Sequence, residues 1–233
     1  GSVWARMMSR LYVVYGSEAS VLTSFMNNVG GAVFRIYNQK KPAPKGNCVD
    51  VLIGDFKSTF QKYCDSENIK EVIFIGAAFS TQSSLMIGET DESIQRQLTT
   101  NITNYVMLAK AVLPIMIKNK FGRFVYLSSF RSETITRGTS LYSASKAFGE
   151  VFFKGLGVEN GAFGVSSTSI KMGYFDGTML EDFTTEQIAN IKRSIGCRRL
   201  GSPEDLEAAI YFCIENFYLN GGALELNGGI SHG

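Results

Sequence analysis

Histidine is almost absent from this chain of 233 residues, since His232, the second-last residue, is the only one. Its scarcity argues against triads built on histidine and against histidine-rich metal sites. Cysteine is also sparse, and Cys48, Cys64, Cys197 and Cys213 are scattered without the spacing of metal ligands. We therefore expect reduced thiols and no metal. Acid–base chemistry has to come from other residue types.

The sequence also has no large excess of charge of one sign and no long apolar run. The chain has 23 Lys and Arg against 21 Asp and Glu, a net charge of +2, which gives no reason to expect a nucleic acid or an anionic membrane as partner. We find no apolar run of the roughly 18 residues that a membrane span needs and no secretory signal, and we expect a cytoplasmic protein. Residues 1–9 are interpreted as an extension or a remnant of cloning, and residues 10–233 as one domain.

What the sequence does contain is an alternation of strand-like and helix-like segments. Short β-branched and aromatic runs predict strands at Arg10–Gly16, Ala32–Asn38, Val49–Asp55, Glu71–Ala77, Gly122–Ser128, Val165–Met172 and Gly222–Gly229. Apolar periodicity and caps predict helices from Leu22 to Val29, from Asp91 to Lys118 with a kink at Pro114, from Leu141 to Val158, and from Pro203 onward. The pattern predicts an α/β class, a single-domain Rossmann fold with a doubly wound parallel sheet of about seven strands and helices on both faces.

Several small or polar residues follow directly after predicted strands. Gly16, Ala77, Ser129 and Gly173 all occupy such positions. In parallel sheets of this kind, ligands bind beyond the carboxyl ends of the strands, near the point where the strand order reverses. We therefore expect the functional site at this edge.

A hydroxyl, a phenol and an ammonium group follow one another at fixed spacing after the fifth strand. Tyr142 comes 13 residues after Ser129, and Lys146 comes four residues later, so the last two share one face of a helix. A neighbouring ammonium lowers the pKa of a tyrosine from about 10, which would let Tyr142 exchange a proton with a carbonyl oxygen. Ser129 would hydrogen-bond the same oxygen. Taken alone, the pair also fits a surface ion pair on an amphipathic helix.

These residues give the chain a resemblance to the short-chain dehydrogenase/reductase family. From about Arg10 to Ser231 the sequence resembles its shorter, single-domain members, with Ser129, the Tyr142-Ser-Ala-Ser-Lys146 signature, and Asn101 at the start of the long helix. It is most similar to the β-ketoacyl-acyl carrier protein reductases. The segments that carry this likeness are Ile75–Met86, Cys197–Asp205 and Leu226–Gly229.

The resemblance implies roles for individual residues. Asn101, Ser129, Tyr142 and Lys146 would be catalytic, with Asn101 holding a water that links Lys146 to solvent. The residues implied in cofactor binding are Gly16, Ser17, Ser20, Asn38, Asp55, Phe56, Ala77, Tyr142, Lys146, Gly173 and Thr178. Because Asn38 is followed by Gln39, Lys40 and Lys41 and not by a carboxylate, we expect NADPH, with NADH as the alternative.

The first turn departs from the family pattern. The family has TGxxxGxG, whereas this chain has Tyr15-Gly16-Ser17-Glu18-Ala19-Ser20-Val21-Leu22. Only the first glycine is kept, Leu22 replaces the last, and Glu18 adds a negative charge near the expected phosphates. Two hypotheses follow: a reductase of a 3-oxoacyl thioester on acyl carrier protein or CoA, and a cofactor-deficient partner subunit in a hetero-oligomer.

The resemblance also implies partners. Lys120 and Arg123 would dock an acidic carrier protein, and residues 172–200 would form a lid over the substrate. The helices at 101–118 and 141–158 would pair two copies into a dimer or tetramer, or join this chain to a paralogue. No nucleic acid or membrane partner is expected.

Overall fold

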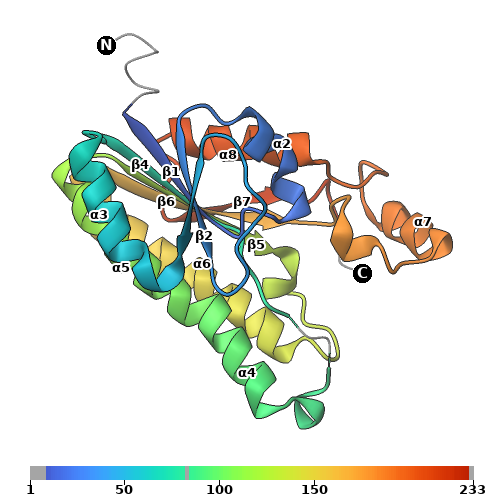
Figure 1. Cartoon of the computed structure of the whole chain (residues 1–233). Helices are drawn as coiled ribbons and strands as arrows, with labels where there is room; N and C mark the ends of the chain where they lie inside the picture. Colours follow the sequence, from blue (N-terminus) through green and yellow to red (C-terminus); the bar gives the residue numbers. More distant parts are fainter. Residues whose placement is uncertain (1–8, 82–83, 231–233) are drawn as a thin grey trace.

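The computed structural model describes residues 9–81 and 84–230. Seven strands form one sheet in the order β3-β2-β1-β4-β5-β6-β7, and every neighbouring pair is parallel (Figure 1). The strands are β1 (Arg10–Tyr15), β2 (Ala32–Tyr37), β3 (Cys48–Leu52), β4 (Glu71–Gly76), β5 (Gly122–Ser129), β6 (Val165–Met172) and β7 (Gly222–Leu226). This confirms the predicted α/β fold, with the strand order reversing between β1 and β4.

Helices cover both faces of the sheet, as predicted. One face carries α3 (Phe56–Ser66), α4 (Asp91–Leu98), α5 (Asn104–Lys118) and α6 (Ser140–Asn160), and the other carries α2 (Thr23–Asn28) and α8 (Pro203–Glu215) (Figure 1). Two apolar clusters result: Phe74, Tyr105 and Phe153 lie in the first, and Phe25 and Ile210 in the second. All six residues of β1 are buried because both of its faces are covered.

The helix after β1 is shorter than predicted. A 3-10 turn, η1 (Ser20–Leu22), comes first, and α2 has only six residues, Thr23–Asn28. Leu22 is fully buried in the cluster beneath α8, so the apolar side chain that replaces the family's glycine is absorbed by the core. We predicted no helix between β3 and β4, where the structure has the 3-10 turn η2 (Ile53–Asp55) and α3.

The long helix is divided, although not at its proline. A π-helical turn, η4 (Thr99–Thr103), separates α4 from α5, and α5 runs on through Pro114 to Lys118. The kink predicted at Pro114 stays a prediction, and the irregularity that divides the helix falls around Asn101. By length and composition the stretch Asp91–Lys118 could span a membrane, but α5 packs its buried side chains against the sheet and is a core helix of this fold.

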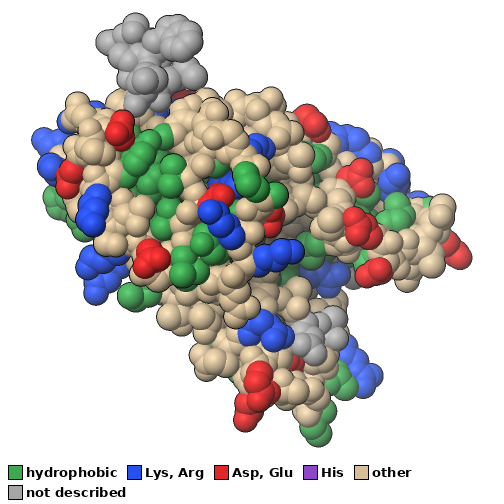
Figure 2. All heavy atoms as spheres, viewed as in Figure 1, with side chains coloured by type: hydrophobic (Ala, Val, Ile, Leu, Met, Phe, Trp, Pro, Cys, Tyr) green, Lys and Arg blue, Asp and Glu red, His purple; other side chains and the backbone are tan. Residues whose placement is uncertain are grey.

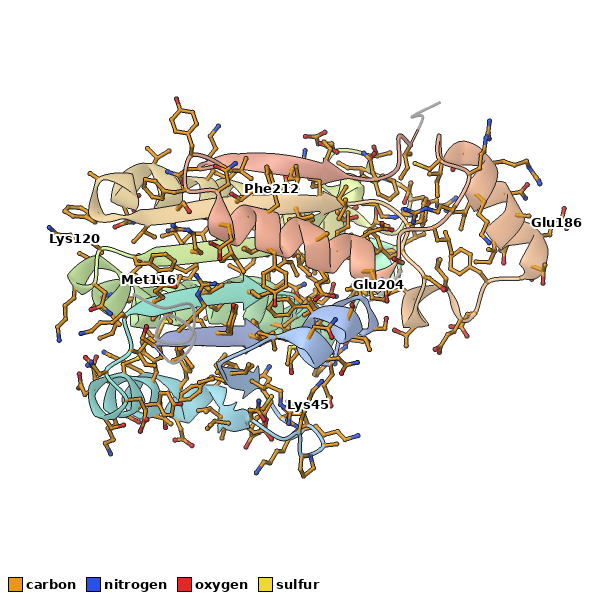
Figure 3. The ribbon with its side chains drawn as sticks, turned by 90° about the horizontal axis from the view of Figure 1, so that it is seen from above. Lys45, Met116, Lys120, Glu186, Glu204 and Phe212 are labelled. Carbon is orange, nitrogen blue, oxygen red and sulfur yellow. The ribbon has the colours of Figure 1, made fainter. Side chains whose placement is uncertain are left out.

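The predicted lid projects from one end of the sheet. After β6, the chain forms η7 (Thr178–Leu180) and then α7 (Thr185–Ser194), which extends away from the body (Figure 1). Seen from above, Glu186 on α7 and Lys120 before β5 lie at opposite ends of the molecule (Figure 3). Of the predicted N-terminal extension, residues 1–8 lie outside the described residues.

Candidate active site

The turns after β1 and β4 pack backbone to backbone. The amides of Ala77 and Ala78 both donate to the Tyr15 carbonyl, at 2.8 Å each. Gly16 has a φ of +86°, and a Cβ there would lie 2.2 Å from the Ala78 nitrogen. Both the backbone angle and the close approach require glycine at position 16. The one glycine retained from the family's pattern is thus the one that brings these two strand ends together.

A groove of about 440 Å³ opens beside these turns, at the carboxyl edge of β1, β2 and β4. Residues of the first turn, the end of β2, the turn after β4 and the lid line it. The lining residues are Tyr15, Gly16, Ser17, Glu18, Ala19, Ser20, Val21, Ile36, Tyr37, Asn38, Lys40, Pro42, Ala77, Ala78, Phe79, Thr100, Thr178 and Met179.

The lid is bonded to the first turn across this groove. Thr178 donates its amide hydrogen to Ser20 Oγ at 3.2 Å, and the two hydroxyls lie 3.3 Å apart. A Cβ at the preceding Gly177 would lie 2.3 Å from Ser20 Oγ. Ser20, at a position where the family has glycine, therefore serves as an anchor for the lid.

Tyr142 lies on the first turn of α6, with its side chain near Ser129 at the end of β5. The pKa of Tyr142 is raised, because burial outweighs the opposing effects of the Ser129 hydrogen bond and the Arg131 charge. We predicted a pKa lowered by Lys146, and that prediction is wrong. The phenol keeps its proton at neutral pH.

The reason lies in the surroundings of Lys146, whose side chain is turned toward the protein interior. Its Nζ donates to the Leu127 carbonyl at 2.9 Å and lies 4.0 Å from the centre of the Phe79 ring. Burial lowers the pKa of Lys146 to about 7, although the nearby Glu150 carboxylate raises it. A buried amine with a neutral carbonyl partner is a weak source of positive charge, so it does little to acidify Tyr142.

Phe79 lies between the groove and the side chains of Tyr142 and Lys146. It lines the groove, and its ring meets the Tyr142 ring edge to face, with ring centres 4.8 Å apart. The same ring covers the Lys146 ammonium. Sequence reasoning missed this residue, although it lies within the segment Ile75–Met86 that carries the resemblance.

Asn101 lies at the centre of the π-helical turn and is fully buried. Its Oδ1 accepts from the Ser80 amide and its Nδ2 donates to the Ser80 carbonyl, both at 2.8 Å. These two bonds attach the long helix to the loop after β4. That Asn101 holds a water linking Lys146 to solvent stays a prediction, and its π-helical turn is of a kind that is frequent at functional sites.

Behind the site, α6 is tied to the sheet by charges. Glu150 accepts a hydrogen bond from Ser128 on β5 and lies 3.7 Å from Lys171 Nζ on β6. Lys171 also pairs with Glu133 and, at 3.8 Å, with Glu225. Because Ser128 belongs to this network, its role is structural, and Ser129 is the serine that faces Tyr142.

Comparisons with known proteins decide the family. The family model described as enoyl-(acyl carrier protein) reductase matches residues 55–231. The chain is 32% identical over 242 aligned residues to the 3-oxoacyl-acyl-carrier-protein reductase FabG of Haemophilus influenzae, covering 96% of this chain and 99% of that protein. The chain belongs to the short-chain dehydrogenase/reductase family. Its relatives include the FabG reductases, so it is an oxidoreductase homologue by family. Members of this family typically use NAD(P)H.

Solved structures of short-chain reductases show the same fold. One is a putative gluconate dehydrogenase from Agrobacterium tumefaciens, with a TM-score of 0.81 and 19% identity, covering 95% of this chain and 97% of that chain. Another is a putative β-ketoacyl-ACP reductase, with a TM-score of 0.76 and 21% identity, covering 94% and 96% of the two chains. The chain is also 31% identical to the uncharacterized oxidoreductase YmfI of Bacillus subtilis, over 62% of this chain and 61% of that protein.

Of the eleven residues predicted to bind a cofactor, some line the groove and others do not, Tyr142 and Lys146 among the latter. Six line the groove: Gly16, Ser17, Ser20, Asn38, Ala77 and Thr178. Asp55 is exposed and Gly173 packs on Asn227, both away from the groove lining. The Phe56 ring is 1% exposed and stacked on Phe60, so the ring belongs to the core, and the role of Phe56 in cofactor binding stays a prediction.

The predicted carrier-docking arginine is enclosed. Arg123 donates to the Ile214 carbonyl at 2.9 Å and to the Gly122 carbonyl at 2.8 Å, and its guanidinium lies 4.1 Å from the centre of the Phe121 ring. It is also at the amino end of β5, six residues and therefore about 20 Å from Ser129. Arg123 therefore holds the sheet and α8 together, which corrects the prediction that it docks a carrier protein.

The buried amine gives a prediction about stability. The pKa of Lys146 falls from 10.5 to about 7 on folding, so between these values the unfolded chain binds more protons and stability rises with pH. We expect the free energy of unfolding of the wild type, relative to Lys146→Met, to increase between about pH 7 and pH 10 by at most about 1.4 kcal/mol per pH unit. Urea denaturation at a series of pH values measures it.

The control is Lys154→Met, which removes an exposed lysine from the same helix. Its stability difference from the wild type should not follow the same pH course. A Lys146→Met difference that is flat over this range, or that falls as the pH rises, would contradict the burial of a neutral amine.

Proposed function

We propose that this chain is an NADPH-dependent reductase that converts the ketone of a 3-oxoacyl thioester, on acyl carrier protein or CoA, to the 3-hydroxyacyl form. The observation that carries the proposal is the Tyr142 side chain, which lies near Ser129 at the carboxyl edge of the sheet and meets the ring of Phe79, a residue of the groove lining. The relationship to FabG supports the substrate class.

The protein groups are suited to the reducing direction. Since its pKa is raised, Tyr142 is protonated at neutral pH and can donate to a carbonyl oxygen as negative charge develops on it. Ser129 Oγ accepts from the Arg131 amide at 3.2 Å, which orients the hydroxyl toward the same oxygen. A bound nicotinamide cofactor supplies the hydride. In the reverse direction Tyr142 would have to lose its proton first, so alcohol oxidation should require strongly alkaline pH.

The rim of the site is suited to an acyl chain. Leu85, Met86 and Ile87 are 43%, 50% and 96% exposed on the loop after β4. Gly138, in the loop before α6, would place a Cβ 3.6 Å from the Ser84 carbonyl, so the two loops are neighbours. An exposed apolar rim beside a proton donor fits a substrate with an aliphatic part.

The groove residues fit a dinucleotide with a phosphorylated ribose. Asn38 and Lys40 line the end of the groove at β2, where no carboxylate stands to bond a ribose 2′-hydroxyl. Glu18 is exposed, so its charge remains in solvent. Gly16 and Ser17 would approach the phosphates, and Lys40 would pair with the 2′-phosphate.

This assignment gives a binding prediction with a matched control. Lys40→Glu should weaken NADPH binding by about tenfold or more, because it replaces a charge-assisted contact by repulsion, and should change NADH binding less. Lys41→Glu, at the exposed neighbour outside the groove lining, should leave the NADPH Kd unchanged. Titration of cofactor fluorescence measures both constants. Equal losses in the two variants would contradict the assignment of the 2′-phosphate to Lys40.

The second candidate is a partner subunit that does not bind cofactor. Two contacts favour it: the Phe79 ring covers Lys146, and the Lys146 ammonium is bonded to Leu127. The wild-type titration separates the two candidates. Binding of NADPH with turnover of an acetoacetyl thioester supports the reductase. Absence of binding, with activity only beside a paralogue, supports the partner subunit.

Assembly and location belong to the same proposal. Met107 on α5 and Val151 and Val158 on α6 are 58%, 71% and 73% exposed, which supports pairing of two copies through these helices into a dimer or tetramer. All four cysteines are free, in keeping with the reducing cytoplasm. On the face shown in Figure 2, basic and acidic side chains are interspersed, which gives no support to a nucleic-acid partner.

A further inference from the structure

Arg131 lies beside the catalytic pair without an acidic partner. It belongs to η5 (Phe130–Ser132) and donates its amide hydrogen to Ser129 Oγ at 3.2 Å. Its guanidinium donates to the Thr136 hydroxyl at 2.9 Å and to the Tyr174 hydroxyl at 3.3 Å. Both of these side-chain partners are neutral hydroxyls from two different loops. They hold the guanidinium in place, but they do not neutralise its positive charge.

The other half-buried or buried arginines in the described part of the chain either have an acidic partner or lie far from Tyr142. Arg10 pairs with Glu71 and Glu215, and Arg35 pairs with Asp50 at 2.6 Å. Arg123 is bonded to backbone carbonyls at the opposite end of the sheet.

The acid nearest to Arg131 in sequence is also engaged elsewhere. Glu133, two residues along the loop, pairs with Lys171 on β6. Among the described residues, no carboxylate forms an ion pair with Arg131. Because a buried charge is normally paired, a half-buried guanidinium without an acidic partner is able to bind an anionic ligand.

Arg131 lies close to Tyr142 and Ser129, the two side chains that would hold the substrate carbonyl. Its positive charge acts on the Tyr142 phenol, and its own backbone amide orients Ser129. Aromatic rings flank it, with the Phe130 centre at 5.4 Å and the Tyr174 centre at 6.0 Å. Two hydroxyls and two rings restrict its side chain, while some of its five N–H donors stay free for a ligand.

We propose that Arg131 forms an anion subsite of the substrate pocket, and that the ketone substrate carries a carboxylate a few bonds from its carbonyl group. The subsite rests on the proposed reductase function, because Tyr142 and Ser129 fix where the carbonyl oxygen lies. A planar guanidinium matches a carboxylate with two parallel N–H···O bonds. In an acyl thioester the carboxylate would belong to the acyl part, and in a free 3-oxo acid it would be the acid group itself.

The test compares two ketones that differ only in charge, acetoacetate and methyl acetoacetate. The measured quantity is the ratio of kcat/KM for the acid to kcat/KM for the ester, with NADPH in excess. Arg131→Gln should lower this ratio about 10- to 100-fold, the range expected for a lost hydrogen bond between two charged groups. Arg131→Lys should keep part of the preference. Arg137→Gln, at an exposed arginine of the same loop, should leave the ratio as in the wild type.

An unchanged ratio in Arg131→Gln, or a wild type that prefers the ester, overturns the subsite while leaving the reductase in place. If the wild type turns over neither ketone nor acetoacetyl-CoA, the reductase fails and binding decides the subsite. Ligand-observed NMR with 3-hydroxybutyrate and its methyl ester then serves as the readout. Binding of the acid alone, lost in Arg131→Gln, supports the subsite without catalysis, and equal signals for acid and ester overturn it.

Discussion

Tyr142→Phe is expected to lower kcat for ketone reduction by about 100- to 10,000-fold, the range that a positioned general acid contributes. The variant loses one hydroxyl, which lies near Ser129 and is the proposed proton donor. The ring remains and can keep its edge-to-face contact with Phe79, so the fold and the groove should be preserved. Steady-state kinetics with an acetoacetyl thioester and NADPH measures the loss, and thermal unfolding checks the fold.

The matched control removes the same atom from another tyrosine. The Tyr126 hydroxyl is fully buried and, among the described residues, has no hydrogen-bond partner. Its ring stacks on Phe153 with centres 4.9 Å apart. Tyr126→Phe should therefore keep activity and gain roughly 1 kcal/mol of stability, since it removes an unsatisfied polar group. Full activity in Tyr142→Phe, or equal losses in both variants, would rule out Tyr142 as the acid.

Gly149→Ala is expected to destabilise the protein and to abolish activity with it. Gly149 lies on α6, one turn after Lys146, where the helix rests on the Tyr126 ring. An added Cβ would lie 2.2 Å from Tyr126 Cζ and 2.3 Å from its hydroxyl oxygen. The ring cannot move aside, because Phe153 and Tyr105 enclose it. Overpacking of this kind costs about 1–3 kcal/mol, and here it displaces the helix that carries the catalytic pair.

A second glycine on the same helix provides the control. A Cβ at Gly155 would meet no atom within 4 Å. Gly155→Ala should raise stability by about 0.5–1 kcal/mol, because alanine loses less backbone entropy in a helix. Chemical denaturation of both variants measures the contrast. A Gly149→Ala protein as stable as Gly155→Ala would show that α6 does not need this close approach to β5.

Phe79 explains why the conserved spacing of Ser129, Tyr142 and Lys146 does not by itself define the chemistry of this chain. In the sequence, Lys146 has the position of an acidifying cation. In the structure, the ammonium group of Lys146 lies over the Phe79 ring and donates to the Leu127 carbonyl. The cation that acts on Tyr142 is Arg131, from a loop that contains no family signature.

The sequence analysis was most successful where a pattern is local. Buried strands such as Val165–Met172 are recognised from β-branched runs, and the strong cap at Ser202 with Pro203 predicts the start of α8, which carries a capping box. It was less successful for short or interrupted helices. The six residues of α2 and the π-helical turn at Asn101 depend on contacts with α8 and with Ser80, which no local pattern contains.

The sequence by itself determined the seven strands and their alternation with helices, the single glycine at the first turn and the i, i+4 placement of Tyr142 and Lys146. These follow from hydrophobic periodicity and backbone sterics, which act over a few residues. Only the tertiary structure decided which charges face which groups. Burial of Lys146, enclosure of Arg123 and the position of the Arg131 guanidinium beside Tyr174 all depend on residues far apart in the chain, because desolvation and Coulomb interactions act through space.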